Sequence, residues 1–239
     1  MKEYYDILIN GIPEGLKVRR IVHGKAWTGA ELDDGSFGIA MYTAGRSIKR
    51  LFPSLVGMEA AAAAQAVMSW NMEEASEGMA VINAYYNSPS RMDSLGCLDD
   101  YNRCVTVGME TEGKKIALIG HLKLHPDALR GAKEVYIIER EPREGDYPDS
   151  ACEYILPECD IVIITGSAAV NKTMPRLLEL SESAQTIVVG PTVPLCPELK
   201  SCGISRLSGL VVTDIAGITG WMTEVSGSPY PFGETFTIY

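Results

Sequence analysis

The fold of this chain is decided by four apolar runs, IALIGH (116–121), VYIIERE (135–141), IVIITGS (161–167) and TIVVGPT (186–192). Each run is short, continuous and rich in Ile and Val, and each breaks into Gly, Ser, Thr, His or Glu. Such runs are typical of strands that are buried on both faces of a parallel sheet. Because ligands bind beyond the carboxyl ends of such strands, we expect a functional site at this edge of the sheet.

Strands and helices alternate from Lys114 onward. Helices are predicted over residues 126–131, 149–156, 172–183 and 197–202, and a fifth strand over residues 207–213. This alternation, with short crossovers, predicts a Rossmann-like domain over residues 114–239 that is built on a parallel five-stranded sheet.

The first 90 residues have a different rhythm. A helix is predicted over residues 4–10, and strands over residues 18–23, 26–32 and 38–42 with tight turns between them. Two helices, over residues 54–70 and 73–85, follow the strands. An antiparallel meander followed by helices predicts a small α+β domain over residues 1–90. Residues 91–113, of mixed polarity with Gly and Asp, are the predicted linker region.

The chain is acidic, with 31 acidic and 21 basic residues among 239 and a net charge of −10. Because it has no Lys/Arg cluster, we expect no nucleic-acid partner and a cationic or neutral ligand. Six cysteines are too sparse for a disulfide scaffold, and no secretory signal or 18-residue apolar run is present. We therefore expect a cytoplasmic protein with reduced thiols and no membrane insertion.

Gly120 ends the first strand of the second half, and Glu139 ends the next strand, 139 − 120 = 19 residues later. In a Rossmann fold, an acidic residue about 20 positions beyond the glycine turn binds a ribose hydroxyl. The turn here reads GHLKLHPD and lacks two of the three glycines of the dinucleotide motif. Glu139 is therefore either a ligand-binding residue or an exposed carboxylate at a strand end.

The other strand ends also allow two interpretations. Thr165-Gly166-Ser167 is followed by Asn171-Lys172-Thr173, where a helix start could bind an anion or Asn171 could simply cap the helix. The loop Gly190-Pro191-Thr192-Val193-Pro194 is stiffened by its prolines, which suits a ligand wall or a rigid turn.

Metal-ligand and catalytic motifs are sparse. His121 and His125 are four residues apart, a spacing that would place both on one face of a helix. The cysteine pairs at 97/104, 152/159 and 196/202 lack CxxC spacing and are more typical of small buried residues. No GxSxG or P-loop motif occurs. NAYYN (83–87) ends a helix and is either a surface cap or one wall of a cleft between domains.

Taken together, these segments resemble the putative heavy-metal chelation family. The resemblance is carried by VINAYYN (81–87), KKIALIGH (114–121), the run from 135 to 180 and VVGPTVPLCPELKSCGI (188–204), and HGKAWTGAEL (23–32) and GSFGIAMY (35–42) fit the family's opening meander. It spans essentially the whole chain. It implies an α/β fold in which an α+β domain like the enolase N-terminal domain precedes the Rossmann-like domain, with a site in the cleft between them.

The family's site pattern falls on specific residues of this sequence. His125 and Lys172 depart from that pattern. The metal ligands that the resemblance implies, named below, offer carboxylate oxygens and an imidazole nitrogen, which would suit a hard or borderline cation. The resemblance implies His121, Glu139 and Asp146 as metal ligands, and Asn83, Gly120, Glu139, Thr165, Gly166, Asn171, Thr173, Gly190, Pro191, Thr192 and Pro194 as ligand-binding residues.

These observations predict a protein of metal homeostasis that binds a small ligand, a heavy-metal ion or a metal chelate, between its domains. The cofactor is unknown beyond a divalent or heavy-metal ion. One alternative is an enzyme that uses a nucleoside-type cofactor, such as S-adenosylmethionine, to modify a chelator-like substrate. Another is an assembly or interaction protein whose cleft is an interface. A homo-oligomer is compatible with each of these.

Overall fold

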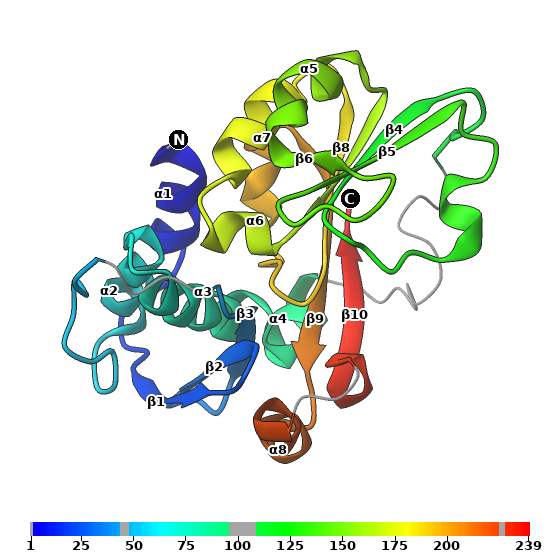
Figure 1. Ribbon diagram of the computed structural model, residues 1–239. Helices are drawn as coiled ribbons and strands as arrows, with labels where there is room; N and C mark the ends of the chain where they lie inside the picture. Colours follow the sequence, from blue (N-terminus) through cyan, green and yellow to red (C-terminus); the bar gives the residue numbers. More distant parts are fainter. Residues whose placement is uncertain (1, 44–47, 96–108, 225–227) are drawn as a thin grey trace.

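The structure is a computed structural model that describes residues 2–43, 48–95, 109–224 and 228–239 (Figure 1). Its strands form two separate sheets, a three-stranded sheet of order β1-β2-β3 and a seven-stranded sheet of order β10-β9-β8-β7-β4-β5-β6. The predicted α/β fold class is confirmed. The predicted division into domains of residues 1–90 and 114–239 stays a prediction, and the predicted linker falls largely on residues 96–108, outside the described ranges.

The first half follows the predicted meander closely. Its elements are α1 (Lys2–Asn10), β1 (Val18–His23), β2 (Trp27–Leu32), β3 (Phe37–Met41), α2 (Ala60–Ala64), the 3-10 helix η1 (Gln65–Met68), α3 (Met72–Tyr86) and α4 (Pro89–Leu95). The strands pair antiparallel, β1 with β2 and β2 with β3.

The predicted helix over residues 54–70 is wrong at its start, because the helix begins only at Ala60. The preceding residues bond to the start of β1 instead: the amide of Val18 donates to Met58 O at 2.9 Å, and that of Gly57 donates to Val18 O at 2.8 Å. A backbone that bonds to a neighbouring strand cannot also close helical turns.

The second half contains the five predicted strands and two more. They are β4 (Lys115–Ile119), β5 (Glu134–Glu139), β6 (Tyr147–Pro148), β7 (Ile161–Thr165), β8 (Gln185–Val189), β9 (Ile204–Val212) and β10 (Gly233–Ile238). All neighbouring pairs are parallel except β9 with β10. The carboxyl ends of β4, β5 and β7 therefore meet at one edge of the sheet, as the sequence predicted.

Short helices connect these strands. They are η2 (Pro126–Leu129), η3 (Asp149–Ala151), α5 (Cys152–Ile155), η4 (Leu156–Glu158), α6 (Ser167–Val170), α7 (Met174–Leu180), η5 (Pro197–Cys202), α8 (Ile215–Glu224) and η6 (Tyr230–Phe232). The predicted helix over residues 172–183 begins only at Met174. Lys172 has a φ of 71°, a left-handed conformation that ends α6 and separates it from α7.

Both faces of the central strands β4, β7 and β8 are buried, as the apolar runs predicted, whereas Val135 of β5 is 42% exposed. Ile116 and Leu118 of β4 pack on one face with residues of the 109–132 segment, whereas Ala117 packs on the other with α6 and α7. This second face continues into the first half, because one hydrophobic cluster includes Tyr5 of α1 and Val162 of β7. The Tyr5 hydroxyl donates to Ala169 O at 2.7 Å and adds a polar contact between the halves.

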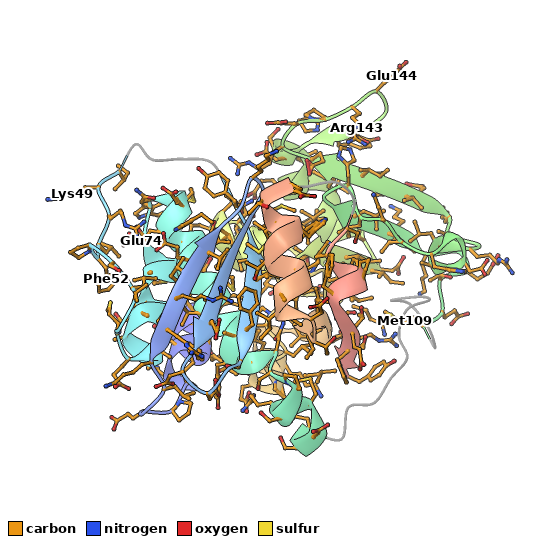
Figure 2. The ribbon with its side chains drawn as sticks, turned by 90° about the horizontal axis from the view of Figure 1, so that it is seen from below. Lys49, Phe52, Glu74, Met109, Arg143 and Glu144 are labelled. Atoms are coloured by element: carbon orange, nitrogen blue, oxygen red, sulfur yellow. The ribbon has the colours of Figure 1, made fainter. Side chains whose placement is uncertain are left out.

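The small sheet is also covered from the C-terminal side. Helix α8 lies beside β1 and β2 (Figure 2), and the amide of Lys25 donates to Met222 O at 3.2 Å. Trp27 of β2 and Trp221 of α8 pack with their rings 6.0 Å apart. No helix within the described ranges has the length and apolar character needed to cross a bilayer.

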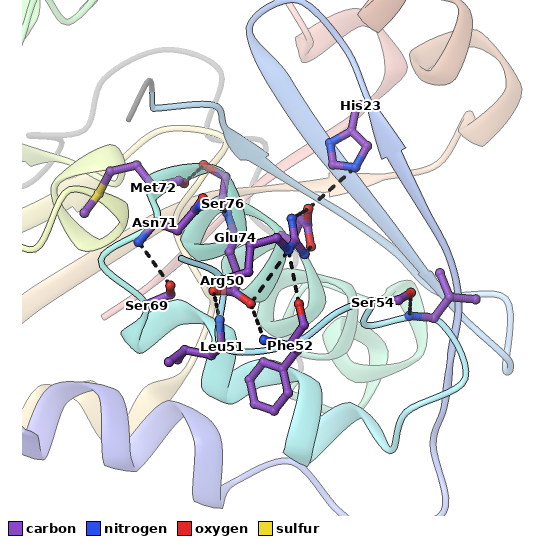
Figure 3. Close-up of polar contacts among 12 residues, drawn as sticks. His23, Arg50, Leu51, Phe52, Ser54, Ser69, Asn71, Met72, Glu74 and Ser76 are labelled. Carbon is purple, nitrogen blue, oxygen red and sulfur yellow. Dashed lines mark hydrogen bonds and ion pairs between the residues drawn. The ribbon is translucent and has the colours of Figure 1, made fainter. Parts of the chain in front are cut away.

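A buried acidic pair fixes the loop that precedes α2 (Figure 3). Glu74 of α3 accepts hydrogen bonds from the amides of Leu51 and Phe52, each at 2.8 Å. Glu77, one turn later, accepts a hydrogen bond from each terminal nitrogen of Arg50, at 2.8 and 2.5 Å. Because the side chains of Glu74 and Glu77 are 0% and 3% exposed, these contacts compensate carboxylates that water does not reach.

Candidate functional site

A cavity of about 430 Å³ lies beyond the carboxyl ends of β4, β5 and β7. Its walls come from the strand ends at Gly120, Glu139 and Thr165, from residues of the 149–153 segment and from residues of the 167–180 segment. All of its lining residues belong to the second half of the chain. The cavity therefore occupies the edge of the sheet that the apolar runs predicted.

Gly120 allows the three strand ends to converge. Its φ is +99°, and a Cβ added to it would lie 3.2 Å from Cγ2 of Thr165 and 3.8 Å from Oε1 of Glu139. Any other L-residue would adopt this backbone with strain and would press on the Thr165 side chain. The glycine thus keeps Thr165 and Glu139 close together at the cavity wall.

Glu139 supplies a carboxylate that is available to a ligand. Its side chain is half-buried at the end of β5 and lines the cavity. Within the described ranges it has no hydrogen bond and no ion pair. Glu153, by contrast, lines the same cavity but is engaged, since its two oxygens accept hydrogen bonds from Arg176 at 3.0 and 2.5 Å.

Neutral polar groups complete the wall. The hydroxyls of Thr165 and Ser167 lie 3.1 Å apart. The Asn171 side-chain oxygen accepts from the amide of Thr173 at 3.1 Å and from its hydroxyl at 2.7 Å. Asn171 therefore shapes the turn before α7, whose N-cap is Thr173, and also lines the cavity.

Lys172 reaches from the cavity wall toward the first half of the chain. Its ammonium donates to the carbonyls of Val67 in η1 and Val170 in α6. Within the described part of the chain no carboxylate forms an ion pair with it. Burial lowers the pKa of Lys172 to about 8. Sequence analysis did not predict this burial, because a lysine beside a helix start is usually solvated.

His121 and Asp146 are bonded to each other outside the cavity lining. Nε2 of His121 lies 2.6 Å from Oδ2 of Asp146, which also accepts the Arg143 amide at 2.7 Å. These hydrogen bonds, the one from the Arg143 backbone foremost, hold the pKa of Asp146 below its ordinary value. Figure 2 shows Arg143 and Glu144 at the tip of this loop, on the far side of the molecule from Glu74.

The proposed histidine pair does not share a helix face. The segment from 120 to 125 is not helical, and His125 instead accepts the amide of Asp127 at 3.2 Å as the cap of η2. In the described part of the chain, no group of three or more His, Cys, Asp and Glu side chains is placed to hold a metal ion.

A second set of predicted residues lies in the packed junction between the halves. Asn83 of α3 is 1% exposed, and its amide donates to Ile39 O at 2.7 Å and to Thr192 O at 3.0 Å. Gly166 packs against the same loop, since a Cβ on it would lie 2.8 Å from Val193 N. Gly190, Pro191, Thr192 and Pro194 form this loop and do not line the cavity.

Asn87 holds the same loop and belongs to NAYYN, the segment predicted as either a surface cap or one wall of a cleft. Its amide donates to Val193 O at 2.8 Å and to Leu210 O at 3.1 Å, and its oxygen accepts the Leu195 amide at 2.8 Å. Asn87 is the C-cap of α3 and lies four residues after Asn83, a spacing that places both side chains on the same side of the helix end.

Burial raises the pKa of the described thiols of Cys152, Cys159 and Cys196. Cys152 lines the cavity, and burial raises the pKa of its thiol to about 11. Burial likewise raises the pKa of Cys159 to about 11 and that of Cys196 to about 12. Because the thiolate is the metal-binding form, these residues act mainly as small buried side chains.

Two family models match this chain. Both are described as putative heavy-metal chelation, and they cover residues 5–86 and 105–228. A solved structure of a protein of unknown function from Desulfitobacterium hafniense DCB-2 is 38% identical, with a TM-score of 0.85 over 99% of this chain and 96% of that one. Another, from Pyrococcus horikoshii, is 25% identical, with a TM-score of 0.80 over 98% and 99%.

A curated relative is matched over a shorter stretch. It is an uncharacterized protein from Methanocaldococcus jannaschii that is 29% identical over 154 residues. The match covers 62% of this chain and 58% of the relative, so the chain spans less than two thirds of that protein's length.

Proposed function

This chain belongs to the family described as putative heavy-metal chelation, and from that premise we propose that it binds a metal chelate in the cavity beyond β4, β5 and β7. A metal chelate here means a heavy-metal ion held by a small organic molecule. The observation that carries the proposal is the half-buried carboxylate of Glu139, which pairs with none of the described residues and lines a cavity of about 430 Å³. A cavity of this volume lies in the range that accommodates small organic ligands.

The wall chemistry favours an organic chelate over a bare ion. A structural Zn²⁺ takes about four protein donors, and Ca²⁺ takes about six to eight oxygen ligands. The cavity offers Glu139 together with neutral hydroxyl and amide groups, which suit recognition of an organic molecule that brings its own metal donors. Binding of a bare metal ion through Nε2 of His121 would require the His121–Asp146 hydrogen bond to break.

A nucleoside-type ligand is the second candidate, and the geometry at Gly120 favours it. The glycine and Glu139 adjoin at the ends of β4 and β5, where a Rossmann fold binds a ribose. In that case the chain would be an enzyme that acts on a chelator-like substrate. The two candidates share Glu139 and differ in what occupies the cavity.

Native mass spectrometry of the protein as isolated, with elemental analysis of the same sample, tests the proposal. We expect a metal together with an organic mass. A nucleoside mass without metal would favour the second candidate. The proposal would be overturned if a metal ion bound without any organic mass and if its affinity were the same in Glu139→Gln as in the wild type.

Alkylation of Cys152 locates the occupant. This thiol lines the cavity and is 7% exposed, so an occupant should slow its modification by a maleimide. Glu139→Gln should abolish the protection, whereas Glu141→Gln, an exposed change of the same kind outside the cavity lining, should retain it.

A further inference from the structure

An ion pair links two walls of the cavity. Arg176 of α7 binds Glu153 of α5 through both carboxylate oxygens, since Nε donates to Oε1 at 3.0 Å and Nη2 donates to Oε2 at 2.5 Å. The helices α5 and α7 lie beside each other (Figure 1). Both side chains line the cavity, and no other ion pair in the described part of the chain joins two lining residues.

The pair lies at the entrance to the cavity. The side chains of Glu153 and Arg176 are 49% and 54% exposed, although both also line the cavity. Cys152, the residue before Glu153, lines the same cavity but is only 7% exposed. A side chain that faces both solvent and cavity lies at the boundary between them. Two such side chains that bind each other therefore narrow the entrance.

The strength of this pair suits a contact that breaks and forms again. A bidentate contact between guanidinium and carboxylate fixes the positions of both side chains, whereas an exposed ion pair adds little to the stability of a fold. Hydrogen bonding from Arg176 holds the pKa of Glu153 below its ordinary value, so the pair stays charged at neutral pH. Because exposed side chains change rotamer rapidly, the pair can open without movement of the backbone.

We propose that Glu153 and Arg176 form a side-chain gate, which narrows the entrance to the cavity while the pair is intact and admits larger molecules when it breaks. This inference rests on the proposed function, because it takes the same cavity as the ligand site, and it adds how a ligand reaches that site.

Glu179 provides a matched comparison. It accepts a hydrogen bond from the same guanidinium at 3.0 Å. It lies on α7 itself and outside the cavity lining, so this contact does not cross the entrance.

Alkylation of Cys152 tests the gate without any ligand. The full chain, dialysed to remove bound small molecules, is treated with N-ethylmaleimide or with a maleimide that carries a rigid pyrene ring. Mass spectrometry of the peptide that contains Cys152 gives the two rates. The readout is the rate with the pyrene reagent divided by the rate with N-ethylmaleimide.

This ratio separates access from reactivity. Burial, foremost, and the charges of Asp149 and Glu153 raise the pKa of the Cys152 thiol, so a charge change beside it alters the amount of thiolate. Both reagents react with the same thiolate, and its amount therefore cancels in the ratio.

Breaking the pair should raise the ratio about threefold, a change of the size that an exposed ion pair can produce. We expect this rise in both Glu153→Gln and Arg176→Met, which change the charge near Cys152 in opposite directions. Glu179→Gln should leave the ratio as in the wild type. Raising KCl from about 0.05 to about 1 M should increase the ratio in the wild type, because salt screens exposed charges, and should not change it in Glu153→Gln.

The gate would be overturned by a ratio that either folded variant of the pair leaves unchanged, by an equal rise in Glu179→Gln, or by a Cys152 that neither reagent modifies even in the variants. Should one variant fail to fold, as circular dichroism would reveal, the other variant and the wild-type salt series still decide. An unchanged ratio would leave the proposed function standing, because no rate depends on a bound chelate. Native mass spectrometry that found a nucleoside or a bare metal ion would count against the chelate and leave the gate standing.

Discussion

The side-chain amide of Asn83 donates to the main-chain oxygen of Thr192 at 3.0 Å, although 109 residues separate the two in sequence. The same amide donates to Ile39 O at 2.7 Å. One side chain therefore joins α3, β3 and the loop after β8. The position of that loop relative to the first half depends on a buried polar contact as well as on apolar packing.

Replacing Asn83 with Ala should destabilise the protein by about 1–3 kcal/mol, because two buried carbonyls lose a donor. Urea unfolding measures this change. Asn10→Ala, at the exposed end of α1, should change the free energy of unfolding little. In the double variant with Asn87→Ala, the loss of unfolding free energy should differ from the sum of the two single losses, because both amides hold the same loop. Strict additivity would argue against this shared role.

Gly120→Ala should cost more than Gly15→Ala. Both glycines have a similar positive φ, +99° and +94°, so both substitutions carry a backbone penalty of about 1 kcal/mol. Only the Cβ at position 120 meets a neighbour, Thr165 Cγ2 at 3.2 Å, since nothing lies within 4 Å of a Cβ at position 15. The difference between the two losses of unfolding free energy, measured by thermal or urea unfolding, reports the crowding of the Thr165 side chain at the cavity.

Arg50→Met should destabilise the protein by about 3 kcal/mol, because the buried carboxylate of Glu77 would keep only His23, 3.6 Å away and half exposed, as a partner. Adding Glu77→Gln should recover part of the loss by removing the buried charge. Arg19→Met is the matched control, since Arg19 pairs with Glu31 but is 64% exposed, and the loss there should stay below about 1 kcal/mol. Equal losses in the two arginine variants would contradict the importance of burial.

Lys172 should make stability rise with pH above neutrality. Its pKa is about 8 in the folded chain against an ordinary value of 10.5, so between these values the unfolded chain binds more protons. The Tyr5 ring lies 5.8 Å from the ammonium, and burial raises the pKa of Tyr5 well above its ordinary value, so Tyr5 keeps its proton in this range.

The measurement is the free energy of unfolding of the wild type minus that of Lys172→Met, followed from neutral pH to about pH 10. This difference should grow in favour of the wild type as pH rises through 8. A flat difference would mean that the amine titrates normally in the folded chain.

The sequence by itself determined the strands, their burial and the edge of the sheet where the cavity lies. Continuous Ile and Val runs favour burial of both strand faces, as in β7, although Val135 of β5 is 42% exposed. The residues that end each run follow directly along the chain. Gly120, Glu139 and Thr165 could be placed at the cavity for this reason. Local signals failed where distant backbone intervened, as at residues 54–59, whose amides and carbonyls bond to the start of β1.

Only the tertiary structure decided which predicted residues share a site. Thr192 and Thr165 both end apolar strands, yet Thr165 lines the cavity while Thr192 is buried against Asn83 and β3. The fates of Lys172 and Asp146 likewise depend on Val67 and His121, which lie 105 and 25 residues away. Contacts of this kind arise from how packed elements meet in space, and neither residue type nor local spacing specifies that meeting.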